Sequence, residues 1–421
     1  MARAASLREW FPVRVVVINT GTELLLGDVV NSHLSFIARE IFSLGLRVER
    51  QLAVPDGDAI RDALAENFAR ADLIFVTGGL GPTTDDVTRE ITAELLGLKL
   101  ISNPELEATI RERLRSRGIR LTNRILRQAQ VPEGALVLPN DHGTAPGLYL
   151  AASGNGEQGT PHLFLLPGPP RELRPMFIDS VVPLLHRFVR HENDLAARVY
   201  RITGMGESYV EEAVGEELLA LPGLELGYCA RMGEVDLRLI GPAAALERGD
   251  VIVRQKLGDK IFSTSGENLE AVIVRQLAKR KATLAVAESC TGGFLAHRLT
   301  NVPGASEVFL AGYVTYSNAA KQSALGVSAA AIAEHGAVSE TVARAMAEGA
   351  RTQAGATYAL STTGIAGPGG GTEAKPVGTA YVALARDGDT LVRQLFFPTD
   401  RETFKQLVAQ TALNLLRENL A

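Results

Sequence analysis

The sequence predicts an α/β protein in which two doubly wound α/β domains are joined by a small α+β domain. Three observations support this prediction. The chain has 421 residues, enough for two or three domains. Apolar, β-branched runs alternate with amphipathic helical segments near both ends of the chain, as in doubly wound sheets. Several of the 41 glycines directly follow such a run, where the backbone can approach a ligand.

The composition excludes several classes of protein. Lys and Arg number 43 and Asp and Glu number 48, so the net charge of −5 argues against a strongly basic nucleic-acid-binding surface. The two cysteines, Cys229 and Cys290, exclude a disulfide framework and a cysteine-rich zinc module. Residues 1–12 lack the apolar run of a signal peptide, and no apolar stretch reaches the ~18 residues of a membrane span. We therefore expect a cytoplasmic protein without a membrane contact.

The first predicted domain covers residues 1–170 and begins with a β-α-β-α-β order. The run RVVVINT, ending at Thr20, is typical of a strand in a buried parallel sheet. The next segment has apolar residues at Leu34, Ile37 and Ile41, which is helical spacing. This order places ligands at the carboxyl ends of the strands. The expected strands are 14–20, 46–54, 72–79 and 162–166, the expected helices are 31–44, 58–70, 90–96 and 104–117, and 154–161 is expected to be a surface hairpin loop.

The second and third predicted domains cover residues 171–264 and 265–421. In the second, Cys229 falls in a strand-like segment and is expected to be a core residue. In the third, Ser265 is a candidate N-cap for the first helix. The expected strand-like segments are 197–204, 225–241, 283–288, 308–317, 357–363, 377–385 and 390–397, and the expected helices are 208–221, 246–258, 269–279 and 401–419, with others between the strands.

Two strand ends of the first domain carry polar residues. Glu23 and Asp28 follow the first strand, and a TGG turn with Asp85 and Asp86 follows the third. Glycines after a buried strand let backbone amides approach a phosphate, and carboxylates at the same edge are typical ligands of Mg²⁺. Asp56, at another strand end, is expected in the same crevice. The plainer alternative is an ordinary turn in which Asp85 and Asp86 cap the next helix.

A family resemblance of the first domain is carried by TGGLGPTTDDVT, VPDGDAI, NDHGTAPG and LPGPPRELRPMF. These segments resemble the molybdopterin-binding domain of molybdenum-cofactor enzymes, and with GTELLLGD they more closely resemble the first domain of the CinA family (competence/damage-inducible protein). The resemblance implies hydrolysis of ADP-ribose to AMP and ribose 5-phosphate with a divalent metal (Mg²⁺, Mn²⁺ or Co²⁺), and with K⁺ as a further candidate ion.

The same resemblance assigns site residues in the first domain. Asp56 and Asp86 match the aspartates of the molybdopterin-adenylylating relatives and are expected to be catalytic. The expected metal ligands are Glu23, Asp28, Asp85 and Asp86. The expected substrate contacts are Gly78, Gly79, Gly81, Thr83, Asn140, Gly143, Thr144, Pro167 and Gly168.

The middle segment resembles the KH-type linking domain of the same family. KH domains bind single-stranded nucleic acid through a GxxG loop with basic neighbours. The corresponding RITGMGESYVEE has GMG without such neighbours, which favours a spacer or dimer element. We therefore expect no nucleic-acid partner.

The segment LAVAESCTGGF gives the sharpest local signal in the third domain. An apolar strand ends at Glu288, Ser289 and Cys290 offer a hydroxyl and a thiol, and TGG opens a helix whose amides can stabilise an oxyanion or hold a phosphate. No histidine motif accompanies them. Lys321 can act as the base if it is partly desolvated, and the alternative for it is a solvated helix lysine. Cys290 is the rival nucleophile, because a thiolate is intrinsically more reactive.

The third domain resembles the nicotinamide mononucleotide (NMN) deamidase domain called PncC. The resemblance is carried by AESCTGG, GYVTYSNAAK, GAVSE, GIAGPGGG and KPVGT. It implies that Ser289 is the nucleophile, Lys321 its general base, and Tyr316 a proton-relay or orienting group, with no cofactor. The expected substrate contacts are Thr291, Gly292, Gly293, Asn318, Thr363, Gly364, Ile365, Ala366, Gly367 and Arg401.

Together these resemblances predict a bifunctional hydrolase of pyridine-nucleotide salvage that acts on NMN and ADP-ribose and forms a homodimer. Two alternatives remain. One is a molybdopterin nucleotidyltransferase, against which the fused deamidase-like domain argues. The other is a non-enzymatic adaptor in DNA uptake or repair, for which the acidic balance of the chain gives little support.

Overall fold

The computed structural model describes residues 13–153, 159–188 and 195–420. The chain folds into two compact units, Met1–Leu195 and Ala196–Ala421. The expectations for residues 1–12 and for residues 154–158 of the predicted hairpin loop lie outside the described residues. None of the helices in the described part of the chain is long and apolar enough to cross a membrane.

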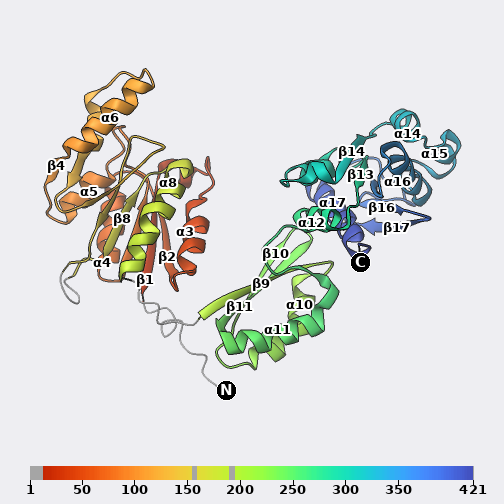
Figure 1. Cartoon of the computed structure of the whole chain (residues 1–421), viewed down its shortest axis with the longest axis horizontal. Coiled ribbons are helices and arrows are strands. Elements are labelled where there is room, and N and C mark those ends of the chain that lie inside the picture. The colour runs from red at the N-terminus through yellow and green to blue at the C-terminus, as the bar shows by residue number, and fades with distance from the viewer. Residues whose placement is uncertain (1–12, 154–158, 189–194, 421) are drawn as a thin grey trace. The chain divides into compact units, whose positions relative to one another are not determined.

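The first unit is a mixed six-stranded sheet with helices on both faces (Figure 1). Its strands are β1 (Arg14–Thr20), β2 (Arg47–Val54), β3 (Leu73–Thr77), β4 (Leu100–Ser102), β5 (Gln130–Pro132), β6 (Leu136–Leu138), β7 (Gly147–Leu150) and β8 (His162–Leu166). Its helices are α2 (Thr22–Leu26), α3 (His33–Phe42), α4 (Asp58–Phe68), α5 (Thr88–Leu95), α6 (Pro104–Ser116), α7 (Asn123–Leu126), α8 (Pro170–Met176) and α9 (Val182–Phe188). The sheet order is β2-β1-β3-β8-β7-β6, and β4 pairs separately with β5.

Alternate residues of the central strands of this sheet fill two cores. On β1, Val15 and Val17 lie in the core with α3 and α8, whereas Val16 and Ile18 lie in the core with α4 and α5. Strands β2, β1, β3 and β8 are parallel, and β7 and β6 add an antiparallel edge. The predicted α/β class and doubly wound arrangement are therefore confirmed, with a mixed sheet.

The helical segment after residue 170 belongs to the first unit. It runs from α8 through η3 (Phe177–Val181) to α9, and Leu173, Phe177 and Leu185 are buried in the core that α3 also fills. The boundary expected at residue 170 therefore falls too early. The physical reason is that the apolar residues after Pro170 cover a sheet face that would otherwise be exposed.

The second unit begins with a small α+β part. Its strands are β9 (Leu195–Thr203), β10 (Glu225–Arg231), β11 (Glu234–Pro242) and β12 (Ile261–Ser263), and its helices are α10 (Glu207–Leu219) and α11 (Ala243–Leu257). The strands form a sheet in the order β10-β11-β9-β12. Both helices pack on this sheet, since Val210 and Val214 of α10 and Leu246 and Val253 of α11 share one core with the strands.

The rest of the second unit is a mixed α/β domain. Its strands are β13 (Leu284–Glu288), β14 (Phe309–Val314), β15 (Tyr358–Gly364), β16 (Thr379–Arg386) and β17 (Asp389–Phe396). Its helices are α12 (Leu269–Arg280), α13 (Phe294–Thr300), α14 (Asn318–Leu325), α15 (Ala329–His335), α16 (Glu340–Ala354) and α17 (Arg401–Glu418). The sheet order is β14-β13-β15-β16-β17, in which β14, β13 and β15 are parallel and β16 and β17 antiparallel.

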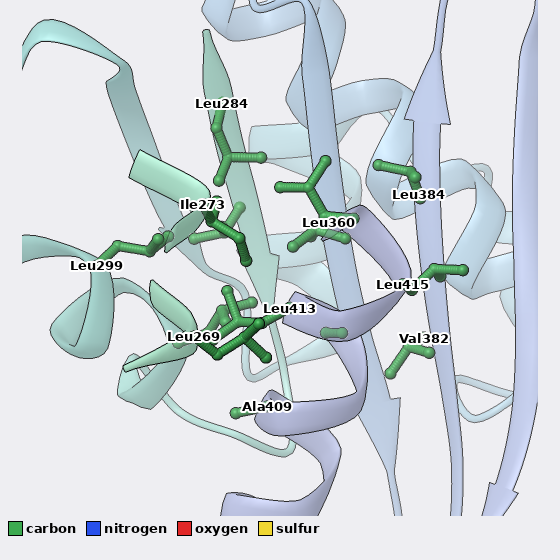
Figure 2. Close-up of a cluster of buried hydrophobic side chains, with 14 of the residues drawn as sticks. Leu269, Ile273, Leu284, Leu299, Leu360, Val382, Leu384, Ala409, Leu413 and Leu415 are labelled. Atoms are coloured by element: carbon green, nitrogen blue, oxygen red, sulfur yellow. The ribbon is translucent and has the colours of Figure 1, made fainter. Parts of the chain in front are cut away.

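The two faces of this five-stranded sheet differ in side-chain size. On one face, Leu284 of β13 and Leu360 of β15 pack with Leu413 of α17, as Figure 2 shows. On the other face, Ala285 and Ala287 of β13 meet α16. The small side chains let α16 lie close to the sheet, so the carboxyl end of β13 is held between two packed layers.

Two expectations for the second unit are wrong. Cys229 is exposed, because β10 is an edge strand whose residues Leu226 and Tyr228 face the core while Cys229 faces away. Ser265 does not cap α12, whose N-cap is Asn268. The Ser265 hydroxyl instead donates to Glu267 Oε2 at 2.9 Å.

Candidate active sites

A pocket of about 530 Å³ lies at the carboxyl ends of the parallel strands in the first unit. Thr20 ends β1, Thr77 ends β3, and Pro167 follows β8, which is where a doubly wound sheet binds ligands. The predicted residues that line the pocket are Glu23, Asp56, Gly78, Gly79, Gly81, Asp85, Asp86, Thr144, Pro167 and Gly168. The predicted residues Asp28, Thr83, Asn140 and Gly143 are not among its lining residues.

The turn after β3 requires glycines, because neighbouring segments of the chain lie very close to its backbone. Gly78 and Gly79 have φ of 104° and 67°, and a methyl group on Gly79 would overlap Thr88 Oγ1. On Gly78 it would lie 2.6 Å from the carbonyl oxygen of Thr20. These contacts explain the glycines structurally, and they also keep the backbone open toward the pocket.

The replacement Gly79→Ala is expected to destabilise the first unit by about 2 to 4 kcal/mol, from left-handed backbone strain and from the clash with Thr88. The matched control is Gly97→Ala, because Gly97 has a φ of 65° but nothing within 4 Å of its added methyl. Urea unfolding of both variants should give a smaller loss for Gly97→Ala. Equal losses would contradict the role assigned to the Thr88 contact.

Asp56 and Asp86 are each held by a threonine. Asp86 Oδ2 accepts hydrogen bonds from the Thr83 amide at 2.8 Å and the Thr83 hydroxyl at 2.5 Å. Asp56 Oδ2 accepts from the Thr22 amide at 3.1 Å and the Thr22 hydroxyl at 3.3 Å. In both carboxylates, Oδ1 takes no part in these hydrogen bonds. Thr83 therefore has a positioning role toward Asp86, and Thr83 itself does not line the pocket.

The capping alternative for Asp85 and Asp86 is wrong. Helix α5 begins at Thr88, its N-cap is Val87, and no side chain caps it. Hydrogen bonding in this turn lowers the pKa of the exposed Asp85 carboxyl.

The predicted metal ligands suit an ion that the substrate also binds, and they do not suit an ion that protein side chains alone would hold. Within residues 13–153, 159–188 and 195–420, no three His, Cys, Asp or Glu side chains are placed to hold a metal together. Glu23, Asp85 and Asp86 line the pocket, whereas Asp28 does not. Mg²⁺ is commonly held by one or two carboxylates together with substrate phosphates. The free Oδ1 of Asp86 suits that mode.

The predicted contacts Asn140 and Gly143 have structural roles. Asn140 Oδ1 accepts from the amides of His142 and Gly143, and its Nδ2 donates to Ala145 O and Glu172 Oε2. A methyl group on Gly143 would overlap Glu172, which explains the glycine. These residues shape the loop that presents Thr144 to the pocket. Their own contact with a substrate stays a prediction.

Sequence reasoning missed several polar residues of this pocket, among them His33, Gln128 and Glu172. Burial lowers the pKa of His33, its Nε2 is buried without a partner, and its Nδ1 lies 3.4 Å from the Thr77 hydroxyl. The signal that could have found His33 is its position in NSH, two residues beyond Asn31, at a strand end that already carried polar residues.

In the second unit, the carboxyl end of β13 brings together Ser289 and Lys321. Lys321 Nζ lies 3.0 Å from Ser289 Oγ and donates to the carbonyl oxygen of Thr315 at 2.7 Å. Thr315 follows the neighbouring strand β14, and its amide donates to Glu288 O at 2.8 Å. Lys321 comes from the first turn of α14, which Ser317 caps by accepting from the Ala320 amide. Adjacent parallel strands therefore place the amine beside the hydroxyl.

Burial distinguishes the reactive groups of this site. Lys321 is 1% exposed, so it is not the solvated lysine of the alternative reading, and desolvation lowers the pKa of its ammonium. Cys290 is 6% exposed, and desolvation raises the pKa of its thiol to about 12. A thiol with that pKa is not a thiolate at neutral pH. The burial of Cys290 therefore favours Ser289 over Cys290 as the candidate nucleophile.

The TGG turn after Ser289 is held by Glu288, a residue whose role the sequence did not reveal. The Glu288 side chain is fully buried, and its carboxylate accepts from the amides of Gly293 (3.0 Å), Leu295 (3.0 Å) and Ala296 (2.8 Å). The Gly292 amide donates to Ser289 O at 3.2 Å. The amides of Gly292 and Gly293 are therefore engaged, and we no longer assign them to an oxyanion or phosphate.

Two predicted threonine contacts are also engaged. The buried hydroxyls of Thr291 and Thr362 lie 2.7 Å apart, and the Thr363 hydroxyl donates to Ala337 O at 2.8 Å. These bonds tie the ends of β13 and β15 to their surroundings. Thr291 and Thr363 therefore shape the site, and because each hydroxyl keeps a further hydrogen-bonding position, their contact with a substrate stays a prediction.

Arg401 links Tyr316 to the loop that follows β15. Arg401 donates to Gly367 O and to the Tyr316 hydroxyl, both at 2.8 Å. Ile365 uses its amide and carbonyl to pair with Thr379 and Gly378. The predicted Gly364 pairs within the sheet, the predicted Ala366 is buried beside this loop, and the predicted Asn318 is exposed at the start of α14.

Three family profiles match the chain. They are the probable molybdopterin binding domain over residues 16–187, the damage-inducible protein CinA KH domain over 197–263 and the CinA C-terminal domain over 266–420. Their order is the order of the first unit and of the two parts of the second.

Similar proteins match along nearly the whole chain. A CinA-like protein of Akkermansia muciniphila is 46% identical, over 95% of this chain and 96% of its own. A putative competence-damage inducible protein of Moorella thermoacetica is 44% identical, over 96% and 98%. Among solved structures, the competence/damage inducible protein CihA from Agrobacterium tumefaciens is 39% identical, with a TM-score of 0.35, and covers 35% of this chain and 91% of that chain.

Proposed function

The chain belongs to the CinA family, and from this premise we propose that its C-terminal domain is a serine amidohydrolase that converts NMN to nicotinate mononucleotide and ammonia. One observation carries the proposal. A fully buried lysine, Lys321, has its Nζ 3.0 Å from Ser289 Oγ at a strand end that opens into a glycine turn. A neutral amine at hydrogen-bond distance from a hydroxyl is the arrangement that activates a serine without a histidine.

Acylation follows from this geometry. Lys321 in its neutral form takes the proton of Ser289 as Oγ attacks the amide carbonyl of NMN. The carbonyl of Thr315 holds Nζ in place through its hydrogen bond. Collapse of the tetrahedral intermediate breaks the C–N bond, and the lysine ammonium returns its proton to the departing ammonia.

Deacylation reverses these roles. Lys321 takes a proton from water as the water attacks the acyl-serine, and it then returns a proton to Ser289 Oγ. Among the described residues, the Thr291 amide donates to no other backbone group, so we assign it to the oxyanion.

Tyr316 has an orienting role in this proposal. Its hydroxyl accepts a hydrogen bond from Arg401 and, within the described part of the chain, forms none with Ser289 or Lys321. The side chain is 63% exposed. These contacts favour the orienting role over a proton relay.

A second activity is supported by the pocket of the first unit. We propose that it hydrolyses ADP-ribose to AMP and ribose 5-phosphate. The support is the set of glycine-turn amides and carboxylates around one pocket of about 530 Å³. Asp86, Asp85 and Glu23 would hold a divalent ion shared with the substrate, and such an ion neutralises phosphoryl charge and acidifies a bound water. Thr83 and Thr22 fix the orientation of Asp86 and Asp56.

The replacement Asp86→Asn is expected to lower ADP-ribose hydrolysis by about 10²- to 10³-fold, because it removes a charge while an amide oxygen can still accept from Thr83. NMN deamidation by the same variant should not change and serves as the internal control. Phosphate release from ribose 5-phosphate and AMP, after coupled phosphatase treatment, measures the first activity. Unchanged ADP-ribose hydrolysis would remove Asp86 from the site.

The overall test is an assay of the purified chain on NMN and on ADP-ribose, with and without Mg²⁺, Mn²⁺, Co²⁺ and K⁺. Inertness toward both substrates would refute the proposal. Adenylylation of molybdopterin by ATP would support the nucleotidyltransferase alternative, and salt-sensitive DNA binding would support the adaptor alternative. Light scattering tests the proposed homodimer.

A further inference from the structure

Ser289 stands in the middle of a row of three hydroxyl side chains. Strand β13 pairs in parallel with β14 and β15, and Glu288 lies in register with the last residue of β14 and with Thr362 of β15. The Thr315 amide donates to Glu288 O at 2.8 Å. The Ser289 amide donates to Thr362 O at 2.9 Å, so the pairing continues one residue further on both sides. Ser289 therefore has Thr315 and Thr363 as its neighbours across the sheet.

The row faces α14 and α16. Ser289 follows Ala287 by two residues, and the Ala287 side chain packs on α16. Lys321 of α14 reaches the Ser289 hydroxyl from this side of the sheet. The Thr363 hydroxyl donates to a carbonyl oxygen of the segment between α15 and α16. Because side chains in register on neighbouring strands point to the same face, Thr315 presents its hydroxyl on the side that carries both Ser289 and Lys321.

Thr315 is the member of the row whose hydroxyl lacks a partner. Ser289 Oγ lies 3.0 Å from Lys321 Nζ, and the Thr363 hydroxyl is bonded to its carbonyl oxygen. Thr315 Oγ1 is buried without a hydrogen-bond partner among the described residues, and Thr315 is 2% exposed. An unpaired buried hydroxyl destabilises the folded state, whereas a valine of similar shape would avoid this penalty. The hydroxyl therefore points to a polar partner that occupies the site during the reaction.

The backbone of Thr315 already holds the base. Its carbonyl oxygen accepts from Lys321 Nζ at 2.7 Å, and this bond leaves the lone pair of the neutral amine free to take a proton. Neighbouring strands lie about 4.8 Å apart, so one water molecule can lie within hydrogen-bond distance of the Thr315 hydroxyl and within reach of an acyl group on Ser289. Thr315 thus contacts the base through its carbonyl and borders the position of this water through its hydroxyl.

We propose that Thr315 is a positioning residue that holds the hydrolytic water of deacylation. The inference rests on the proposed deamidase function and deepens it at the second step. The water donates one O–H to Thr315 Oγ1 and the other to Lys321 Nζ, which directs an oxygen lone pair at the acyl carbon. The water oxygen bonds to that carbon while its proton passes to Nζ. The bond from the carbon to Ser289 Oγ then breaks, and Oγ recovers the proton from Nζ.

The test separates deacylation from acylation in the full-length chain. Thr315→Val removes the hydroxyl and keeps the shape of the side chain, so kcat for NMN should fall about 10- to 100-fold, as for a misplaced reactant. KM should fall with it and kcat/KM should stay constant, because acylation is unchanged. The variant should release ammonia in a rapid burst, and mass spectrometry should show the acyl group accumulated on Ser289. Thr315→Ser should restore kcat.

The matched control is Thr390→Val. Thr390 is also buried, on β17, and its hydroxyl donates to Glu348 Oε1 at 2.9 Å. Its replacement should lower the melting temperature and leave kcat and the burst as in wild type. Thr315→Val gives up no protein hydrogen bond and should melt no lower than wild type. Thr315→Ala, which also lacks the hydroxyl, replaces Thr315→Val if the latter does not fold.

Two outcomes would overturn the inference: a wild-type kcat in Thr315→Val, or an equal loss of kcat and kcat/KM without accumulated acyl-enzyme. The activated ester p-nitrophenyl acetate separates this inference from the proposed function. If wild type is inert toward NMN but hydrolyses the ester through Ser289, and acetyl-enzyme accumulates in Thr315→Val, the deamidase proposal fails and the role of Thr315 stands. If neither compound acylates either protein, both are refuted.

Discussion

Ser289→Ala is expected to lower the rate of ammonia release from NMN by about 10⁴- to 10⁶-fold, the loss seen when a serine nucleophile is removed from a coupled catalytic group. The physical reason is that no other group within the described site can form the acyl-enzyme. Lys321 Nζ faces Ser289 Oγ at 3.0 Å, whereas the thiol of Cys290 is buried. Rapid-quench measurement of the acyl-enzyme should show none in the variant.

The matched control is Cys290→Ala. Burial raises the pKa of the Cys290 thiol to about 12, so its removal should leave kcat close to wild type. It should cost some stability, because Cys290 packs in the core of the domain. If the alanine variant at Cys290 is inactive while folded, and Ser289→Ala retains activity, the assignment of the nucleophile is wrong.

Lys321→Met is expected to lower kcat/KM for NMN by about 10²- to 10⁴-fold, the usual contribution of a general base. Lys321→Arg keeps the positive charge but cannot be deprotonated, so it should be similarly inactive. Equal losses of kcat/KM in the two variants would show that the missing base, and not the missing positive charge, causes the effect. Far-UV circular dichroism and thermal unfolding would confirm that both variants fold.

The pH dependence gives an independent test of the same residue. Burial disfavours the ammonium form of Lys321 and lowers its pKa from the ordinary value of 10.5. The base is active when deprotonated, so kcat/KM should rise with pH and level off above the lowered pKa. Lys321→Met should lose this rise. Retention of the same rise in the variant would show that another group titrates.

The sequence pattern was sufficient for the fold class, and the resemblance to the NMN deamidase domain was needed to pair Ser289 with Lys321. Buried parallel strands leave a strong signal, because β1, β3 and β13 are continuous apolar runs that end in glycine turns. Motifs at such strand ends meet at one edge of the sheet, so residues far apart in the chain could be placed together.

Other features depended on contacts that a sequence pattern does not contain. The boundary after residue 170 required the packing of Phe177 on the first core. The engagement of Gly292 and Gly293 depended on the position of the Glu288 carboxylate. The exposure of Cys229 depended on which strand of the second sheet lies at its edge. In each case a three-dimensional neighbour decided the role of the residue.

The unequal accessibility of the two thiols has a practical consequence. Cys229 lies on the edge strand β10 and is exposed, and Cys290 is buried next to Ser289. A maleimide dye should therefore attach at one position of the natural sequence and leave ammonia release intact. The same contrast means that mild oxidants would modify Cys229 before they reach Cys290. The protein thus carries a single accessible thiol for attachment of a fluorescent label.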